Sequence, residues 1–154
     1  MMGIYEKKLA EEGITLPDAP APAANYVPYV LSGNVLYVSG QISQNASGLI
    51  LGKLGESMTT DQGAEAAKFC AINLLAQVKS ACEGDLDKIL RVIKLTGFVN
   101  STPDFTQQPQ VINGASDLMG SVLGDAGKHA RVAVSANSLP LGVAVEIDGI
   151  FQIA

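Results

Sequence analysis

The C-terminal segment His129–Ala154 has the strictest pattern in the chain, because apolar residues recur at nearly every second position. This alternation predicts two β-strands on either side of a turn at 139–142. In the second strand one face is apolar, and Glu146 and Asp148 point the other way. Arg131 stands opposite the valines of the first strand. If both strands lie in one sheet, Arg131 and Glu146 project from the same face, away from the main core.

An arginine and a carboxylate on rigid strands have two interpretations. On the outer face of a sheet, they are commonly a solvated cross-strand pair that contributes little to stability. Held in fixed positions, they can instead bind an anionic group and position a water molecule. The sequence offers no better pair for a reaction site than Arg131 and Glu146.

The residues around this pair, and a second group near the N-terminus, carry a resemblance to a known family. The C-terminal group is Ala130-Arg131-Val132-Ala133-Val134, Leu139-Pro140 and Val143-Ala144-Val145-Glu146-Ile147. The N-terminal group is Ala21-Pro22-Ala23-Ala24, Pro28-Tyr29-Val30 and Val38-Ser39-Gly40-Gln41-Ile42. Their order and spacing resemble the RidA/YjgF family of reactive-intermediate (enamine/imine) deaminases, which also carries an L-PSP endoribonuclease label. We therefore predict an N-terminal helix and proline-rich arm over residues 1–20 and a RidA/YjgF-like domain over residues 21–154.

The remaining segments predict an α+β fold with a mixed β-sheet. Helices are expected at 4–12, from Thr59 to about 82, and at 110–123, and further strands at 27–31, 35–39 and 89–99. Thr59 and Gln62 have the spacing of a capping box. Because the two long helices can cover only one face, the other would expose Leu90, Val92 and Phe98 unless another subunit covered it. The resemblance implies a chorismate-mutase-like fold and a homotrimer with clefts between subunits.

Composition excludes several classes of protein. The net charge of −5 and the lack of a basic run argue against a nucleic-acid binder, because Lys and Arg supply most phosphate affinity. No apolar run is long enough for a membrane span and no leader is visible, which favours the cytoplasm. Cys70 and Cys82 fall in one helix about 18 Å apart, so reduced core thiols are expected. With a single histidine, His129, they form no zinc set, and no metal or cofactor is expected.

The resemblance implies hydrolysis of 2-imino or enamino acids to 2-keto acids and ammonia. Arg131 would bind the substrate carboxylate and Glu146 would position the attacking water. The family also places Tyr29, Ser39, Gly40 and Asn113 in the substrate cleft, although Tyr29 would serve equally well as a packing aromatic and Ser39 as a strand-end hydroxyl bonded to backbone. His129 is interpreted as a solvated loop residue. Many members have a cysteine two residues after the arginine, and this chain has Ala133 there.

Two other functions remain open. A binding module of the same fold would hold carboxylates through Arg131 without turning them over. An endoribonuclease or translation inhibitor would match the label of some relatives, but the acidic charge argues against it. The expected partners are small 2-imino and 2-keto acids and further copies of the chain, with no nucleic acid and no membrane.

Overall fold

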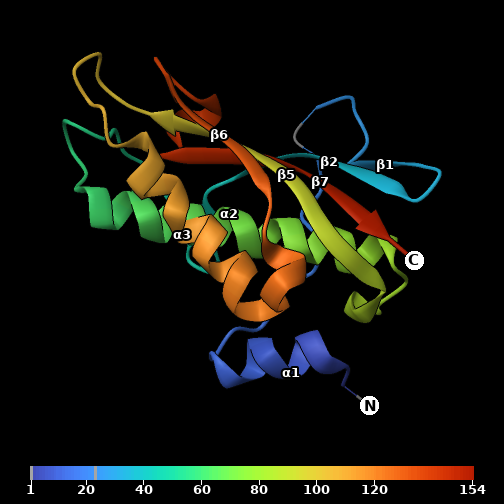
Figure 1. Ribbon diagram of the computed structural model, residues 1–154. Coiled ribbons are helices and arrows are strands. Elements are labelled where there is room, and N and C mark those ends of the chain that lie inside the picture. Colours follow the sequence, from blue (N-terminus) through green and yellow to red (C-terminus); the bar gives the residue numbers. More distant parts are fainter. Residues whose placement is uncertain (1, 23) are drawn as a thin grey trace.

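Five strands form one mixed β-sheet, and two long helices pack on one of its faces (Figure 1). The computed structural model describes residues 2–22 and 24–154; Met1, in the predicted arm, and Ala23, in the N-terminal motif, lie outside the described residues. The sheet has the order β1-β2-β7-β5-β6. Its strands are β1 Tyr29–Ser32, β2 Val35–Ile42, β5 Ile89–Asn100, β6 Ala130–Ala136 and β7 Val145–Ile153. The predicted α+β fold with helices on one face is confirmed.

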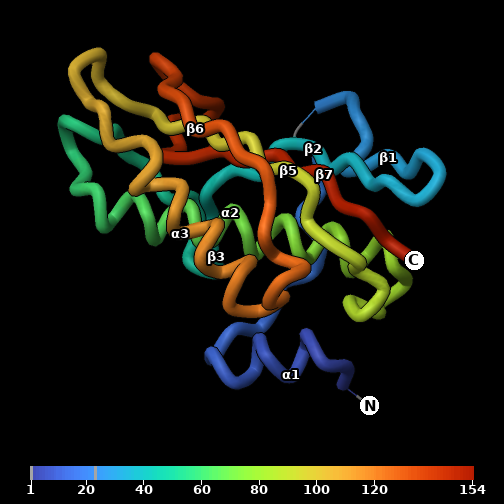
Figure 2. Tube along the Cα trace, viewed as in Figure 1, coloured from blue at the N-terminus to red at the C-terminus, as the bar shows by residue number. Residues whose placement is uncertain are grey.

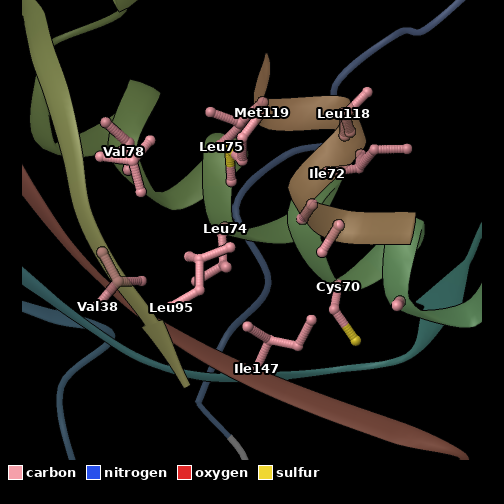
Figure 3. Packing of buried hydrophobic residues seen from close by; sticks show 14 of the residues in the cluster. Val38, Cys70, Ile72, Leu74, Leu75, Val78, Leu95, Leu118, Met119 and Ile147 are labelled. Atoms are coloured by element: carbon pink, nitrogen blue, oxygen red, sulfur yellow. The ribbon is translucent and has the colours of Figure 1, made fainter. Parts of the chain in front are cut away.

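Helix α2, Thr60–Ala81, begins at the capping box that the sequence predicts. The Thr59 hydroxyl accepts a hydrogen bond from the Gln62 amide at 3.2 Å, and the Gln62 side chain accepts one from the Thr59 amide at 2.9 Å. These bonds satisfy two backbone donors that a helix start leaves free. The helix buries Leu74 beside Leu95 of the sheet and Leu75 beside Met119 of the second long helix, as Figure 3 shows.

Helix α3, Gln108–Leu123, starts two residues earlier than expected, because Pro109 lies in its first turn instead of interrupting it. A proline there costs no helical hydrogen bond. The two helices approach each other closely at Gly114, where a Cβ atom would lie 1.9 Å from the carbonyl oxygen of Ala64. This contact fixes the position of α3 over the sheet.

The two C-terminal strands do not pair, because β5 lies between them. Strand β6 is parallel to β5, and β7 is antiparallel to it. Leu95 of β5 is opposite both Arg131 and Gly149, so Arg131 shares the helix-covered face with buried Leu95. Glu146 is opposite Phe98 and projects from the other face, here called the open face.

The prediction that Arg131 and Glu146 share a face is therefore wrong. Alternation defines which residues of a strand lie together, but it does not say which of the two faces is buried. In the edge strand β6, Ala133 packs against the core, whereas Val132 and Val134 are 40% and 41% exposed. The valines face outward, so the arginine faces the helices.

The open face is rich in apolar side chains. Of the three residues expected there, Leu90, Val92 and Phe98, one lies elsewhere. Val92 is fully buried, because register shifts on either side of it place it opposite Phe151 on the core face. Leu90 is 50% exposed and Phe98 is half-buried. With Val132 and Val134, they leave an apolar surface that nothing in the described chain covers.

The N-terminal segment packs against the helix layer on the side away from the sheet (Figures 1 and 2). Helix α1, Ile4–Glu11, buries Leu9, and its first amide donates to the Asp87 carboxylate at 3.0 Å. The Gln77 side chain donates to the Pro20 carbonyl at 2.6 Å, which ties down the end of the arm. Short elements complete the described chain: β3 Gln44–Asn45, β4 Gly48–Leu49, and 3-10 turns η1 Leu86–Lys88, η2 Gly124–Gly127 and η3 Pro140–Gly142. No helix in the described ranges is long and apolar enough to span a membrane.

Candidate active site

The predicted site residues fall into two groups on opposite faces of the sheet. Arg131 and Asn113 meet on the helix-covered side of β6, and Gly40 and Glu146 meet on the open face between β2 and β7. One protomer therefore does not bring the arginine and the glutamate together.

The Arg131 guanidinium extends from β6 to α3, where side chains hold it. Its Nη1 donates to Asn113 Oδ1 at 2.8 Å and to Ser116 Oγ at 3.2 Å. Asn113 and Ser116 are three residues apart in a helix and so lie on one face of it. Asn113, which the family resemblance places in the substrate cleft, contacts Arg131 here, and its role in a cleft stays a prediction. Ser116 was missed, although its spacing from Asn113 would have indicated it.

His129 is not a solvated loop residue, contrary to expectation. Its half-buried ring lies just before β6, with Nε2 at 2.9 Å from Ser116 Oγ and Nδ1 at 2.6 Å from the Gly127 carbonyl oxygen. The turn η2 brings that carbonyl under the imidazole. The sequence contains no local motif for this contact, because it depends on how η2 folds back on α3.

The Glu146 carboxylate lies directly over Gly40. A Cβ atom on Gly40 would be 2.2 Å from Glu146 Oε2, so only glycine leaves room for the carboxylate in this position. Burial raises the pKa of Glu146, and the neighbouring Asp148 carboxylate raises it further. A carboxyl whose pKa moves toward neutrality is a better proton acceptor and donor near neutral pH.

Ser39 and Tyr29 belong to the strands beside this group, but within the described residues neither side chain donates a hydrogen bond to the Glu146 carboxylate. Ser39 Oγ donates to the Val27 carbonyl at 2.7 Å, which is the strand-end bond given above as its alternative role. Tyr29 is opposite buried Val38 and packs partly against the core. A hollow of about 50 Å³ reaches Gly40 from the side of the arm, lined by Pro28, Gln41 and Gln77 among others.

The cysteines lie outside both groups. The Cys70 thiol donates to the Val145 carbonyl at 3.4 Å inside the core, and burial raises its pKa well above the usual range. Cys82 is buried at the end of α2. Within the described ranges, no three His, Cys, Asp or Glu side chains gather as they would to hold a metal ion.

The fold and the pair of residue groups define an α+β protein of the YjgF type, and comparison with known families agrees. Residues 6–148 match the family described as "YjgF/chorismate mutase-like, putative endoribonuclease". This match spans most of the chain, and the protein belongs to that family.

Individual relatives cover nearly the whole chain. Protein TCP17 of Trypanosoma cruzi is 51% identical over 98% of this chain and 95% of its own length. A crystal structure of an Agrobacterium tumefaciens protein of unknown function is 50% identical and superposes with a TM-score of 0.91, covering 98% of this chain and 94% of that one. The structure of RidA from a Psychrobacter species is 27% identical with a TM-score of 0.59, covering 88% and 94% of the two chains.

Proposed function

We propose that the protein is a cofactor-free deaminase that hydrolyses reactive 2-imino and enamino acids to 2-keto acids and ammonia. The observation that carries this proposal is the pre-oriented guanidinium of Arg131, held at Nη1 by Asn113 and Ser116. The fork formed by its Nη2 and Nε donates no hydrogen bond within the described chain. Two parallel N–H donors of this kind match a planar carboxylate.

Glu146 would activate the water. Its raised pKa suits a base that takes a proton from water and later returns it. In the proposed reaction, an enamino acid first tautomerises to the imine. Water then adds to the C=N carbon, and one of its protons passes to Glu146. Glu146 returns that proton to the nitrogen, and the hydroxyl gives up its own proton as the C=O bond forms and the C–N bond breaks, so the nitrogen leaves as ammonia. The products are a 2-keto acid and ammonia, so atoms balance without a co-reactant.

Arg131 and Glu146 would act on one substrate only across a subunit boundary, because they lie on opposite faces of the protomer's sheet. We therefore propose a ring in which the Arg131 group of one protomer meets the open face of the next. A head-to-tail contact of this kind closes into a cyclic oligomer. A homotrimer with three such clefts is what the family resemblance implies, and the exposed Val132, Val134 and Leu90 support burial in an interface.

A trapping assay tests this function. A threonine dehydratase would generate 2-iminobutanoate, and semicarbazide would report how much of it survives. We expect the wild-type protein to lower the trapped signal and Arg131→Ala to abolish this effect. Lys128→Ala is the matched control, because the side chain of this neighbouring cation is 78% exposed and, within the described residues, forms an ion pair with Asp125 alone. Equal activity of Arg131→Ala and wild type would refute the assignment. Binding of 2-oxobutanoate without hydrolysis of any imine would favour the carboxylate-binding alternative.

A ribonuclease is the second candidate, because the family description and the description of a Shewanella oneidensis relative both read "putative endoribonuclease". That relative is 31% identical with a TM-score of 0.94 and is matched over 98% of this chain and 100% of its own. The net charge of −5 disfavours RNA affinity. Cleavage of a labelled RNA that persists through purification of the oligomer, and falls with salt, would favour the ribonuclease over the deaminase.

A further inference from the structure

We propose that Ser116 and His129 form a hydrogen-bond relay that positions Arg131, and that the relay requires His129 to carry its proton on Nδ1. The inference rests on the proposed role of Arg131 as carboxylate anchor. It adds two positioning residues and a defined protonation state to that role. Neither residue would contact the substrate.

The direction of each bond follows from what each group can donate. The Gly127 carbonyl oxygen can only accept, so the Nδ1 atom 2.6 Å away must carry the hydrogen. In a neutral imidazole, Nε2 then has a free lone pair and accepts from the Ser116 hydroxyl at 2.9 Å. With its hydrogen turned toward His129, Ser116 Oγ presents a lone pair to Arg131 Nη1 at 3.2 Å. The opposite tautomer would place two lone pairs against each other at Nδ1.

The relay is anchored to rigid backbone. Gly127 is buried at the end of η2, and a Cβ atom there would lie 2.1 Å from the Met119 carbonyl oxygen, so η2 sits tightly on α3. Ser116 belongs to the same helix. The imidazole is therefore held between η2 and α3, which pack tightly against each other. The guanidinium is positioned in turn through its hydrogen bond to Ser116.

The consequence for Arg131 is a restricted orientation. Asn113 Oδ1 and Ser116 Oγ take both hydrogens of Nη1, which leaves the Nη2 and Nε side for a ligand. Losing the Ser116 acceptor would let the guanidinium rotate about its long side chain. The carboxylate would then bind more weakly in ground state and transition state alike, so KM would rise while kcat would hold.

The first test is the tautomer itself, which needs no activity. His129 is the one histidine of the chain, so the imidazole nitrogens of the full-length protein labelled with ¹⁵N-histidine give unambiguous NMR signals. At about pH 8.5, where an imidazole is ordinarily neutral, we expect a protonated Nδ1 and an unprotonated Nε2. The Nε2–H form, which free histidine side chains usually prefer in water, would overturn the relay.

The second test separates positioning from general structural damage. Ser116→Ala and His129→Leu should each raise KM for 2-iminobutanoate about tenfold and weaken 2-oxobutanoate binding in parallel, with kcat changed less than about twofold. Ser116→Thr keeps the hydroxyl, and His129→Gln keeps an acceptor near Nε2. Both should restore most of the affinity. Unchanged KM in Ser116→Ala, or the same loss in Ser116→Ala and Ser116→Thr, would overturn the proposal.

The two proposals fail in different ways. If Arg131→Ala loses activity while Ser116→Ala and His129→Leu retain wild-type KM, the relay is wrong and the deaminase stands. If the wild-type protein hydrolyses no imine and binds no 2-oxobutanoate, the deaminase is wrong. The tautomer measurement then decides the relay alone.

Discussion

Mixing two inactive variants would test whether the active site spans two subunits. Arg131→Ala removes the anchor from one face of every protomer, and Glu146→Gln removes the base from the other face. Each variant alone would leave every cleft of the proposed ring defective. In a mixed trimer, however, one of the clefts would receive Arg131 from a Glu146→Gln protomer and Glu146 from an Arg131→Ala protomer, and it would be intact.

The expected recovery follows from counting the clefts. Every mixed trimer has about one intact cleft in three, whichever variant is in excess. Random assembly of equal amounts makes about three quarters of the trimers mixed, so the pool should regain about a quarter of wild-type activity. Mixed species isolated through two different affinity tags should show about a third.

Co-expression with the two tags, tandem purification and the semicarbazide assay provide the readout. The control mixes Arg131→Ala with the Arg131→Ala, Glu146→Gln double variant, which offers no intact cleft and should stay inactive. Mixed oligomers without recovered activity would refute the shared site, because a cleft with Arg131 from one protomer and Glu146 from the next would then not be sufficient for activity. Recovery of about a half in the doubly tagged species would indicate a dimeric ring instead of a trimer.

Three further outcomes follow from the same contacts. Gly40→Ala should fold with nearly unchanged Tm, because the flexible end of the Glu146 side chain can move aside. The displaced carboxylate should nevertheless lower kcat/KM about a hundredfold. Activity equal to that of wild type would show that the position of the carboxylate is unimportant. The pKa values of Glu146 and Asp148 are both raised in the folded state, in each case chiefly by burial, so their ionisation costs stability as pH rises from the unfolded pKa through the folded one. Glu146→Gln should accordingly raise Tm at pH 8 relative to wild type by about 1–3 °C and lose that gain at low pH, where wild type is protonated; a gain independent of pH would contradict this account. Gly114→Ala should lower the free energy of unfolding by about 1–3 kcal/mol, because its methyl group would push α3 away from the Ala64 carbonyl; an unchanged denaturant midpoint would contradict that close contact.

Local signals in the sequence were sufficient for most of the fold. The capping box at Thr59 and the apolar stripe of α2 predicted that helix to within a residue at its start. Alternation predicted the core face of β7 correctly, since Val145, Ile147 and Phe151 are fully buried. These patterns work because each depends on neighbours in one element.

Features that depend on distant segments were not predictable in this way. The insertion of β5 between β6 and β7 leaves no local trace in either strand, and alternation alone did not say which face of β6 the helices cover. Val92 lies in the core, and not on the open face as predicted, because β5 has register shifts that alternation does not reveal. His129 has a structural partner only because η2 folds back on α3.

The separation of Arg131 from Glu146 bears on how the glutamate would work. In the protomer, burial and then the Asp148 carboxylate already raise the pKa of Glu146, so its carboxylate is a stronger proton acceptor than a solvated one. A neighbouring subunit covering the open face would remove more water and raise that pKa further. The guanidinium of the neighbour's Arg131 group would act in the opposite direction, because a cation stabilises the carboxylate form. Substrate binding would then partly neutralise that guanidinium through the carboxylate of the imino acid and make Glu146 a stronger proton acceptor while water is attacking. Assembly would thus bring the two site residues together and also link them: binding of the substrate carboxylate to Arg131 would increase the basicity of Glu146.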